Sequence, residues 1–189
     1  MILPVIAYGN PILKQKCIDI TSHLPWVDKL IKDMWKTLYA ANGAGLAAPQ
    51  IGRPVRLFIV DTVQVYDHSD INEKEMFIAD TGIKEVFINP KIIETSGKLW
   101  TEKEGCLSLP GLDLEIERNI LVTIKYLDEN FTEQEKTFIG TTARTILHEY
   151  DHIEGVLISD YKNYEEITNE LVKISRGLIK VHYRMKFNK

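Results

Sequence analysis

The chain of 189 residues has few cysteines and no long apolar run. Only Cys17 and Cys106 occur, so a disulfide framework is not expected and an intracellular location with reduced thiols fits better. No apolar stretch approaches the roughly 20 residues that a membrane-spanning helix needs. The N-terminus has neither a basic region nor a small-residue cleavage site, so no signal peptide is expected. The net charge of -4 gives no general basic footprint for nucleic acid.

What remains is the composition of an ordinary globular protein. Hydrophobic residues make up 44% and charged residues 26%, and the length suffices for one domain with a real core. We found neither an internal repeat nor a low-complexity linker. Residues 1–189 are therefore expected to form a single domain.

Helices and strands both leave a pattern. Apolar residues at helical spacing predict a helix over residues 26–41, and further helices are expected over 141–154 and 165–176. Residues 56–61 and 84–89 are expected to be strands, separated by a polar stretch, 62–82, that suits a solvated loop. Residues 120–127 and Glu133–Ile139 flank a turn at 128–130 and predict a hairpin.

The tail after Gly177 has a different pattern. Apolar residues alternate with basic ones from Ile179 to Phe187, which indicates a strand with a basic outer face. Such a strand would pair onto a sheet edge. The alternative is a contact with an acidic or nucleic-acid surface.

The most informative stretch is HEYDH, residues 148–152. On a helix, His148 and His152 share one face, so both imidazoles can reach one metal ion. Glu149 lies beside the first ligand, where a carboxylate can take a proton from a metal-bound water. The spacing favours a metal-dependent hydrolase. The alternative is an exposed helix that carries two histidines among other polar residues.

A catalytic metal usually has three protein ligands and one open position, so a third ligand is needed. Cys106 is the better candidate because it lies in EGCLSLP, where a glycine permits close backbone approach. Cys17 has no such context. A buried inert thiol is the alternative for either cysteine.

A third segment, GAGLAAPQ at residues 43–50, follows the first expected helix. Its small residues would let a substrate backbone come close, and Gln50 could donate a hydrogen bond to an oxyanion. By itself the segment could equally be a glycine-rich turn. It lacks the setting and the third glycine of a dinucleotide site.

Together, GAGLAAPQ, EGCLSLP and HEYDH resemble, in this order, the three signature motifs of the peptide deformylase family. The resemblance covers nearly the whole chain, from YGNPIL at residues 8–13 to IEG at residues 153–155. With the mixed strand and helix pattern, it implies an α+β fold. Antiparallel sheets would pack around the central metal-binding helix, followed by a C-terminal helix and a terminal strand.

The resemblance also implies a role for each site residue. Glu149 would be the general acid and base, while Gln50 and the backbone N–H of Leu107 would stabilise an oxyanion. Gly45 would offer backbone groups to the substrate. Glu104 and Arg118 would pair and brace the loop that carries Cys106. The metal ligands would be Cys106, His148 and His152, with water as the fourth.

The activity implied is hydrolysis of the N-formyl group from N-formylmethionyl peptides, with release of formate. One divalent metal per chain is implied, with Fe²⁺ first and Zn²⁺, Ni²⁺ or Co²⁺ as alternatives. Formylated peptides are the expected partners. Binding to a membrane or to a specific nucleic-acid sequence is not expected. Some members dock on the ribosome through a C-terminal helix, but the tail here is expected to be a strand. Bacterial cytoplasm is the expected location, and an organelle is the alternative.

Three departures from the family pattern stand out. Leu147 replaces the usual Gln before the first histidine, and Glu102 occupies a usually apolar position near the substrate pocket, which would make the rim more acidic. Residues 62–82 form a longer connection than in short members. Two other functions therefore remain as alternatives: an HExxH metallopeptidase and an inactive metal-binding homologue. Cys106 argues against the first, because such peptidases usually take a third His or Glu.

Overall fold

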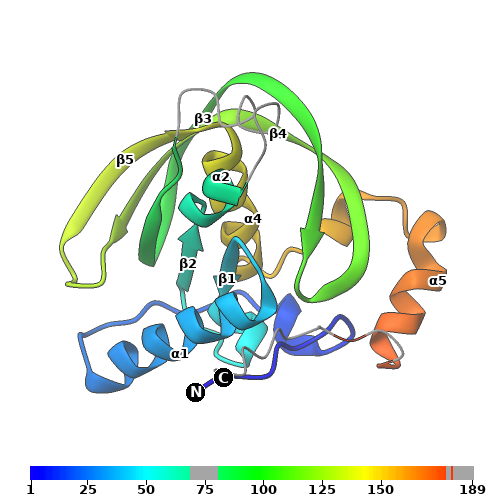
Figure 1. Ribbon diagram of the computed structural model, residues 1–189, viewed down its shortest axis with the longest axis horizontal. Coiled ribbons are helices and arrows are strands. Elements are labelled where there is room, and N and C mark those ends of the chain that lie inside the picture. Colours follow the sequence, from blue (N-terminus) through cyan, green and yellow to red (C-terminus); the bar gives the residue numbers. More distant parts are fainter. Residues whose placement is uncertain (69–80, 178–179, 181–189) are drawn as a thin grey trace.

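The computed structural model describes residues 1–68, 81–177 and 180. Five strands within these residues form one antiparallel sheet in which each strand pairs with the next along the chain. The strands are β1 (Gly45–Ala47), β2 (Leu57–Asp61), β3 (Lys84–Cys106), β4 (Leu109–Leu127) and β5 (Glu133–Ile139). The long β3–β4 ribbon arches over helix α4 (Gly140–Ile153), as Figure 1 shows.

The other helices surround this core. Helix α1 (Pro25–Ala41) and helix α5 (Tyr164–Ser175) lie on different sides of the molecule (Figure 1). The short helix α2 (Val63–His68) follows β2. Three short 3₁₀ helices complete the described elements: η1 (Pro11–Lys14), η2 (Ala48–Ile51) and η4 (Ile158–Tyr161).

Helix α4 is almost entirely enclosed because it packs against the sheet on several sides. Ala143, Ile146 and Ile153 are fully buried and lie in one cluster with side chains of the sheet. Phe87 of β3 stacks on Phe58 of β2 in the same cluster, with ring centroids 4.7 Å apart. Each large apolar side chain buried in this way stabilises the fold by about 1.5–3 kcal/mol. The motif helix is therefore fixed by its apolar face, which leaves its other face for polar groups.

Helix α1 is bounded by local signals. Pro25 occupies the first turn, where its missing N–H costs nothing, and Asn42 ends the helix in the left-handed region at φ 58°. Its apolar stripe, including Met34 and Leu38, packs against β1 and β2 in a second cluster. A third cluster packs α5 against the C-terminal end of β3 and the N-terminal part of β4.

The expected helices and the expected α+β class are confirmed within one or two residues at each boundary. The two central strands are much longer than predicted: 84–89 extends to Cys106, and 120–127 begins at Leu109. Register shifts interrupt the β3–β4 pairing at four places, which breaks the regular alternation that would have marked one long strand. Part of the predicted loop 62–82 forms α2, and the rest of it mostly lies outside the described residues, as does the predicted strand at 179–187.

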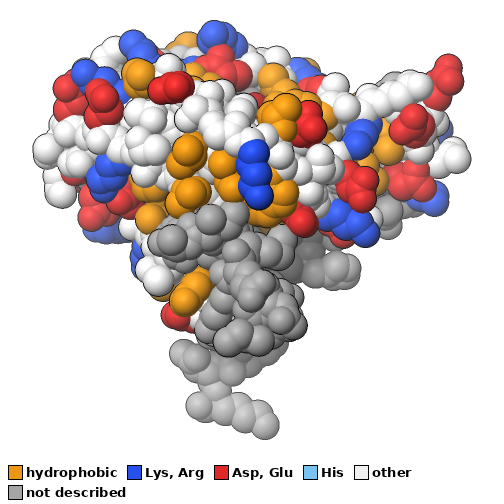
Figure 2. Space-filling model, turned by 90° about the horizontal axis from the view of Figure 1, so that it is seen from above, with side chains coloured by type: hydrophobic (Ala, Val, Ile, Leu, Met, Phe, Trp, Pro, Cys, Tyr) orange, Lys and Arg blue, Asp and Glu red, His pale blue; other side chains and the backbone are white. Residues whose placement is uncertain are grey.

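The surface carries both charge signs. On the face that Figure 2 shows, acidic and basic side chains of the described residues are interspersed, with apolar side chains between them. This distribution fits the small net charge. Within the described ranges, no helix is long and apolar enough to cross a membrane.

Candidate metal centre

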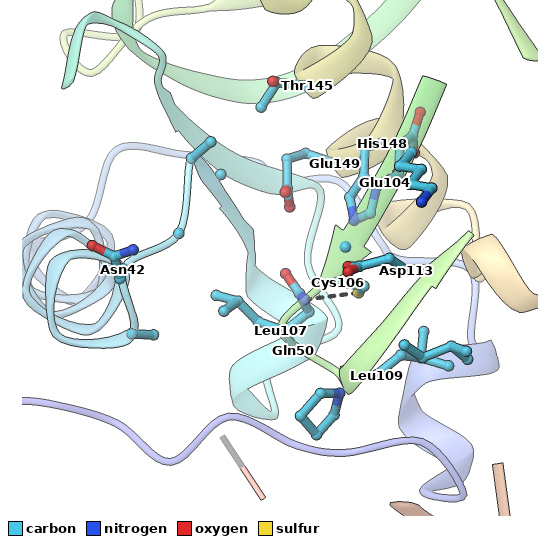
Figure 3. Close-up of a pocket in the computed structure, with 18 of the residues that line it drawn as sticks. Asn42, Gln50, Glu104, Cys106, Leu107, Leu109, Asp113, Thr145, His148 and Glu149 are labelled. Atoms are coloured by element: carbon cyan, nitrogen blue, oxygen red, sulfur yellow. Dashed lines mark hydrogen bonds and ion pairs between the residues drawn. The ribbon is translucent and has the colours of Figure 1, made fainter. Parts of the chain in front are cut away.

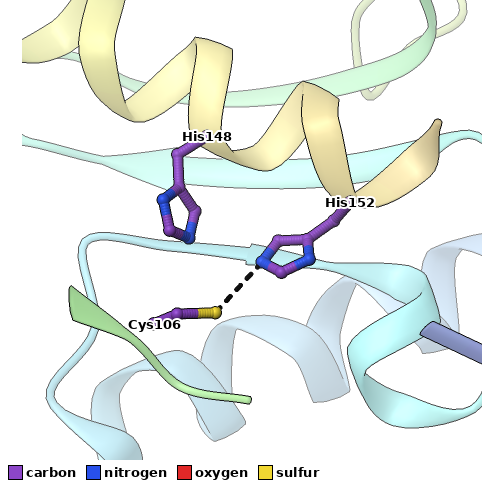
Figure 4. Close-up of side chains that lie close together, drawn as sticks. All are labelled: Cys106, His148 and His152. Atoms are coloured by element: carbon purple, nitrogen blue, oxygen red, sulfur yellow. Dashed lines mark hydrogen bonds between the residues drawn. The ribbon is translucent and has the colours of Figure 1, made fainter. Parts of the chain in front are cut away.

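Three potential metal ligands meet between α4 and the end of β3. His148 and His152 are one turn apart on the helix, and Cys106 is the last residue of β3 (Figure 4). Their ligand atoms all lie within 4.8 Å of one another, and Cys106 Sγ is 3.3 Å from His152 Nε2. All three side chains are buried. The i and i+4 spacing thus directs both imidazoles toward the same thiol.

The donor set suits one divalent ion. A thiolate and two imidazoles are ligands that borderline-soft metals such as Zn²⁺ and Fe²⁺ accept, and the spacing of the three atoms is compatible with bonds of about 2.0–2.3 Å. Cys106 and His148 also line a cavity, so one side of the group is open to an incoming molecule. A catalytic metal site requires such an open position. The residues present therefore fit a single catalytic metal ion.

The two histidines differ in protonation. Burial and the neighbouring charge of His148 hold the pKa of His152 well below its usual value, so this imidazole is neutral. Burial also disfavours charge on His148, but hydrogen bonds with Cys106 and Glu104 prevail and raise its pKa well above the usual value. Cysteine and histidine bind a metal only in their deprotonated forms, so metal binding at such a group releases protons.

The cavity beside the ligands has a volume of about 650 Å³. Residues 41–45 line one side of it, and residues 103–107 and 109–113 line the other (Figure 3). Thr145, Arg144 and Thr141 of α4 line it as well. The cavity thus lies between the segment that joins α1 to β1 and the ends of β3 and β4.

Glu149 lies in this cavity next to the metal ligands. A Cβ on Gly45 would be 2.5 Å from Glu149 Oε1, so the absence of a side chain at Gly45 gives the carboxylate its room. Glu149 Oε2 is buried and has no hydrogen-bond partner among the described residues. Burial raises the pKa of the Glu149 carboxyl to about 7. Such a group exchanges protons readily near neutral pH.

Gln50 reaches the same point from η2. Its Oε1 accepts a hydrogen bond of 2.8 Å from the Ala47 N–H, which directs Nε2 toward the metal ligands. Nε2 is 3.2 Å from Ser108 Oγ and 3.8 Å from Cys106 Sγ (Figure 3). Leu107 lies directly after Cys106, between β3 and β4, and lines the cavity. The Gln50 amide is thus a donor beside the thiol, and Leu107 follows that thiol in the chain.

Glu104 and Arg118 form a buried ion pair with two parallel hydrogen bonds. Arg118 Nε is 2.6 Å from Glu104 Oε1, and Arg118 Nη2 is 2.9 Å from Glu104 Oε2. His148 Nδ1 is 2.9 Å from Oε2 as well. Burial raises the pKa of Glu104, but the hydrogen bonds from His148 and Arg118 outweigh it and lower the pKa to about 2. The Glu104–Arg118 pair therefore holds the metal ligand His148 through a hydrogen bond from Glu104. The pair also lies next to the loop of Cys106.

Two of the family departures have a structural account. Leu147 is buried and packs in the apolar cluster around α4, where its side chain adds to the core. Glu102 is not among the described residues that line the cavity, but its charge acts on Arg144, which does line it. Asp113 lines the cavity as well (Figure 3).

Sequence reasoning missed several polar residues around the ligands. Arg144 contacts Glu104, Ser108 contacts Gln50, and Asp151 contacts Arg118 at 3.0 Å. Arg144 and Asp151 lie four and three residues from His148 on α4, so helical spacing places them near that histidine but does not reveal their partners on β3 and β4. Nothing in the local sequence marks Ser108.

The fold and the site together define a metalloprotein of the α+β class, in which one helix and one strand end supply a buried Cys-His-His group that opens into a cavity. The chain belongs to the polypeptide deformylase family, whose family model matches residues 2–167. A peptide deformylase of Christiangramia forsetii is 45% identical and covers 99% of this chain and 96% of its own length. One of Flavobacterium psychrophilum is 44% identical, with coverage of 98% and 97%.

Solved structures agree with this assignment. The crystal structure of peptide deformylase from Ehrlichia chaffeensis matches with a TM-score of 0.84 and 28% identity, covering 94% of this chain and 97% of that one. A peptide deformylase from Synechococcus elongatus, solved in complex with actinonin, matches with a TM-score of 0.75 and 35% identity, covering 91% and 85%.

Proposed function

We propose that this chain is a metal-dependent hydrolase that removes the N-formyl group from the N-terminal formylmethionine of nascent polypeptides and releases formate. The observation that carries the proposal is the buried Cys106–His148–His152 group with Glu149 beside it in the same cavity. Membership of the polypeptide deformylase family supplies the substrate class. A single catalytic domain over residues 1–189 is part of the proposal.

Glu149 is the proposed general base and acid. Its buried carboxylate takes a proton from the attacking water and returns it to the leaving amine. The metal, when bound, supplies a Lewis acid and a water whose pKa lies near neutrality. Cys106, His148 and His152 would hold the metal, with a fourth position left for water.

Two donors are proposed to stabilise the oxyanion that develops on the formyl oxygen. These are Gln50 Nε2, directed by the Ala47 N–H, and the backbone N–H of Leu107. Each donor placed where charge develops contributes about 3–4 kcal/mol to the transition state. Gly45 would offer backbone groups to the peptide, because a side chain at this position would meet Glu149.

The metal is proposed to be Fe²⁺, with Zn²⁺, Ni²⁺ or Co²⁺ able to occupy the same donors. The relatives named above are bacterial, which supports a bacterial cytoplasmic enzyme. Contact with the ribosome stays a prediction, because the tail that would make it lies mostly outside the described residues.

The test is anaerobic formate release from a formyl-Met peptide by Fe²⁺-loaded protein, with metal-free protein as the control. Metal-dependent release is expected. Glu149→Gln should retain the metal and lose about 10²–10⁴-fold in turnover, because the carboxylate that moves the proton is gone. Absence of release from fully loaded wild-type protein would contradict deformylation and favour an inactive homologue.

The same assay distinguishes the rival metallopeptidase. A peptide of the same sequence without the formyl group should remain intact. Cleavage of an internal bond in that peptide would instead support an endopeptidase. Near-wild-type turnover of Glu149→Gln would remove this carboxylate from the mechanism.

A further inference from the structure

We infer that Arg144 is a positioning residue of the metal centre: it fixes the Glu104 carboxylate that orients His148. The inference rests on the metal centre of the proposed function and is independent of the substrate. Among the described residues, the Arg144 side chain donates no hydrogen bond to the three metal ligands. Its effect on the metal centre therefore passes through Glu104.

The first observation is the full set of hydrogen bonds at Glu104. Oε1 accepts from Arg118 Nε at 2.6 Å and from Arg144 Nη1 at 2.7 Å. Oε2 accepts from Arg118 Nη2 at 2.9 Å and from His148 Nδ1 at 2.9 Å. An ionised carboxylate offers about four acceptor sites, so all of them are used. The oxygen that holds His148 is therefore positioned by Arg118 directly and by the two arginine contacts of the other oxygen.

The second observation is how Arg144 itself is held. Its Nη1 also donates to the Ile116 carbonyl at 2.9 Å, and its Nη2 donates to the Trp100 carbonyl. The guanidinium carbon lies 4.5 Å from the centroid of the Trp100 ring. Trp100 belongs to β3 and Ile116 to β4, so Arg144 connects both strands of the ribbon to α4. Only 7% of its surface is exposed, and these contacts hold its guanidinium between the ribbon and the helix.

Arg118 cannot replace this contact. Its third nitrogen, Nη1, is 3.0 Å from Asp151 Oδ2, so its donors toward Glu104 are already committed. Without Arg144, Glu104 would be held by Arg118 alone, with one hydrogen bond fewer on Oε1, and the carboxylate would hold His148 less firmly. Because Glu104 can only accept, Nδ1 of His148 carries the proton and Nε2 is left for the metal. Loss of this orientation loosens a ligand and weakens metal binding, typically about 10–100-fold.

Arg56 provides a matched control. It is also an arginine with 7% of its surface exposed, and it also contacts a carboxylate, a backbone carbonyl and an aromatic ring, through Glu154, Pro90 and Tyr150. It makes no recorded hydrogen bond to Glu104 or to the metal ligands. Arg56→Met therefore removes a comparable buried charge without touching the carboxylate that holds His148.

The experiment measures metal binding by the full chain. Zn²⁺ affinity is determined by chelator competition, and the Co²⁺ visible spectrum reports ligand geometry. Arg144→Met should raise the Zn²⁺ dissociation constant about 10-fold or more and change the Co²⁺ spectrum. Arg144→Lys, which retains one donor, should give an intermediate affinity. Arg56→Met should lower the melting temperature and leave both metal readouts at wild-type values.

Wild-type affinity and spectrum in Arg144→Met would overturn the inference, as would an equal loss of affinity in Arg56→Met. If Arg144→Met does not fold, Arg144→Lys decides: a wild-type affinity and spectrum overturn the inference, and a weaker affinity with an altered spectrum supports it. Failure of the wild type to bind Zn²⁺ or Co²⁺ at all would instead refute the metal centre itself.

Discussion

A carboxylate without water around it is costly unless charged partners surround it. Glu104 meets this condition with two arginines and a histidine, all within hydrogen-bond distance. Its charge is then available to orient His148 at any pH at which the protein is folded. The ion pair is best understood as a device for holding a ligand, since buried pairs often contribute little net stability.

Glu104 should remain ionised in folded, metal-free protein well below the pH at which ordinary glutamates protonate. Its pKa is lowered from 4.5 in the unfolded chain to about 2 in the fold. The resulting stabilisation, roughly 3 kcal/mol, is fully present above pH 4.5 and is lost as the pH falls toward 2. Carbon-13 NMR of labelled glutamate carboxyls should show one signal that stays in the ionised range at pH 4. A midpoint near 4.5 for Glu104 would contradict this.

At the scale of elements, β1 and α4 approach so closely that a side chain at Gly45 would meet the Glu149 carboxylate. The backbone of Gly45 is not in the left-handed region, so a positive φ does not explain the glycine. Its missing side chain instead leaves room for the Glu149 carboxylate. Strand and helix are thereby linked at the group that is proposed to move protons.

Gly45→Ala should fold and bind metal but lose turnover, because the new methyl would displace the Glu149 carboxylate. A loss of about 10²-fold is expected for a misplacement of this size. The check is a double-mutant cycle in which Gly45→Ala is added to Glu149→Gln. No further loss is expected in the double variant, since the displaced group is already inactive. Independent, additive losses would place the effect of Gly45 elsewhere.

The sequence indicated some elements better than others for a physical reason. Helices α1 and α4 carry local periodicity, and the His148–His152 spacing is itself local, so both could be predicted. Strands β3 and β4 pair with bulges, and their alternation is only partly visible before the pairing is known. Arg144 went unnoticed because its meaning depends on Glu104, which lies 40 residues away in the chain. Gln50 was a candidate from its own segment, whereas the roles of Leu107 and Glu104 came only from resemblance to a family.

At the scale of the whole molecule, the metal should contribute to stability, because its ligands come together only in the fold. A metal present at about 1,000 times its dissociation constant adds about 4 kcal/mol. For a protein of this size, chelation should then lower the melting temperature by roughly 8–16 °C. Calorimetry with and without chelator measures the difference.

Two cysteine variants provide the control. Cys106→Ser should abolish the effect of the chelator, whereas Cys17→Ser should retain it. Cys17 is buried in the core, and burial raises the pKa of its thiol to about 11. It is therefore an inert thiol that does not belong to the metal-ligand group. An unchanged chelator effect in Cys106→Ser would reject Cys106 as a ligand.

The separation of the ligands along the chain has a consequence for biosynthesis. Cys106 precedes His152 by 46 residues, and the entire β4–β5 hairpin lies between them. During translation, the thiol emerges long before either imidazole and has no partners with which to hold a metal. Metal insertion must therefore follow synthesis of the motif helix. A chain truncated before residue 148 should leave the ribosome with an exposed thiol, open to oxidation, and without the metal.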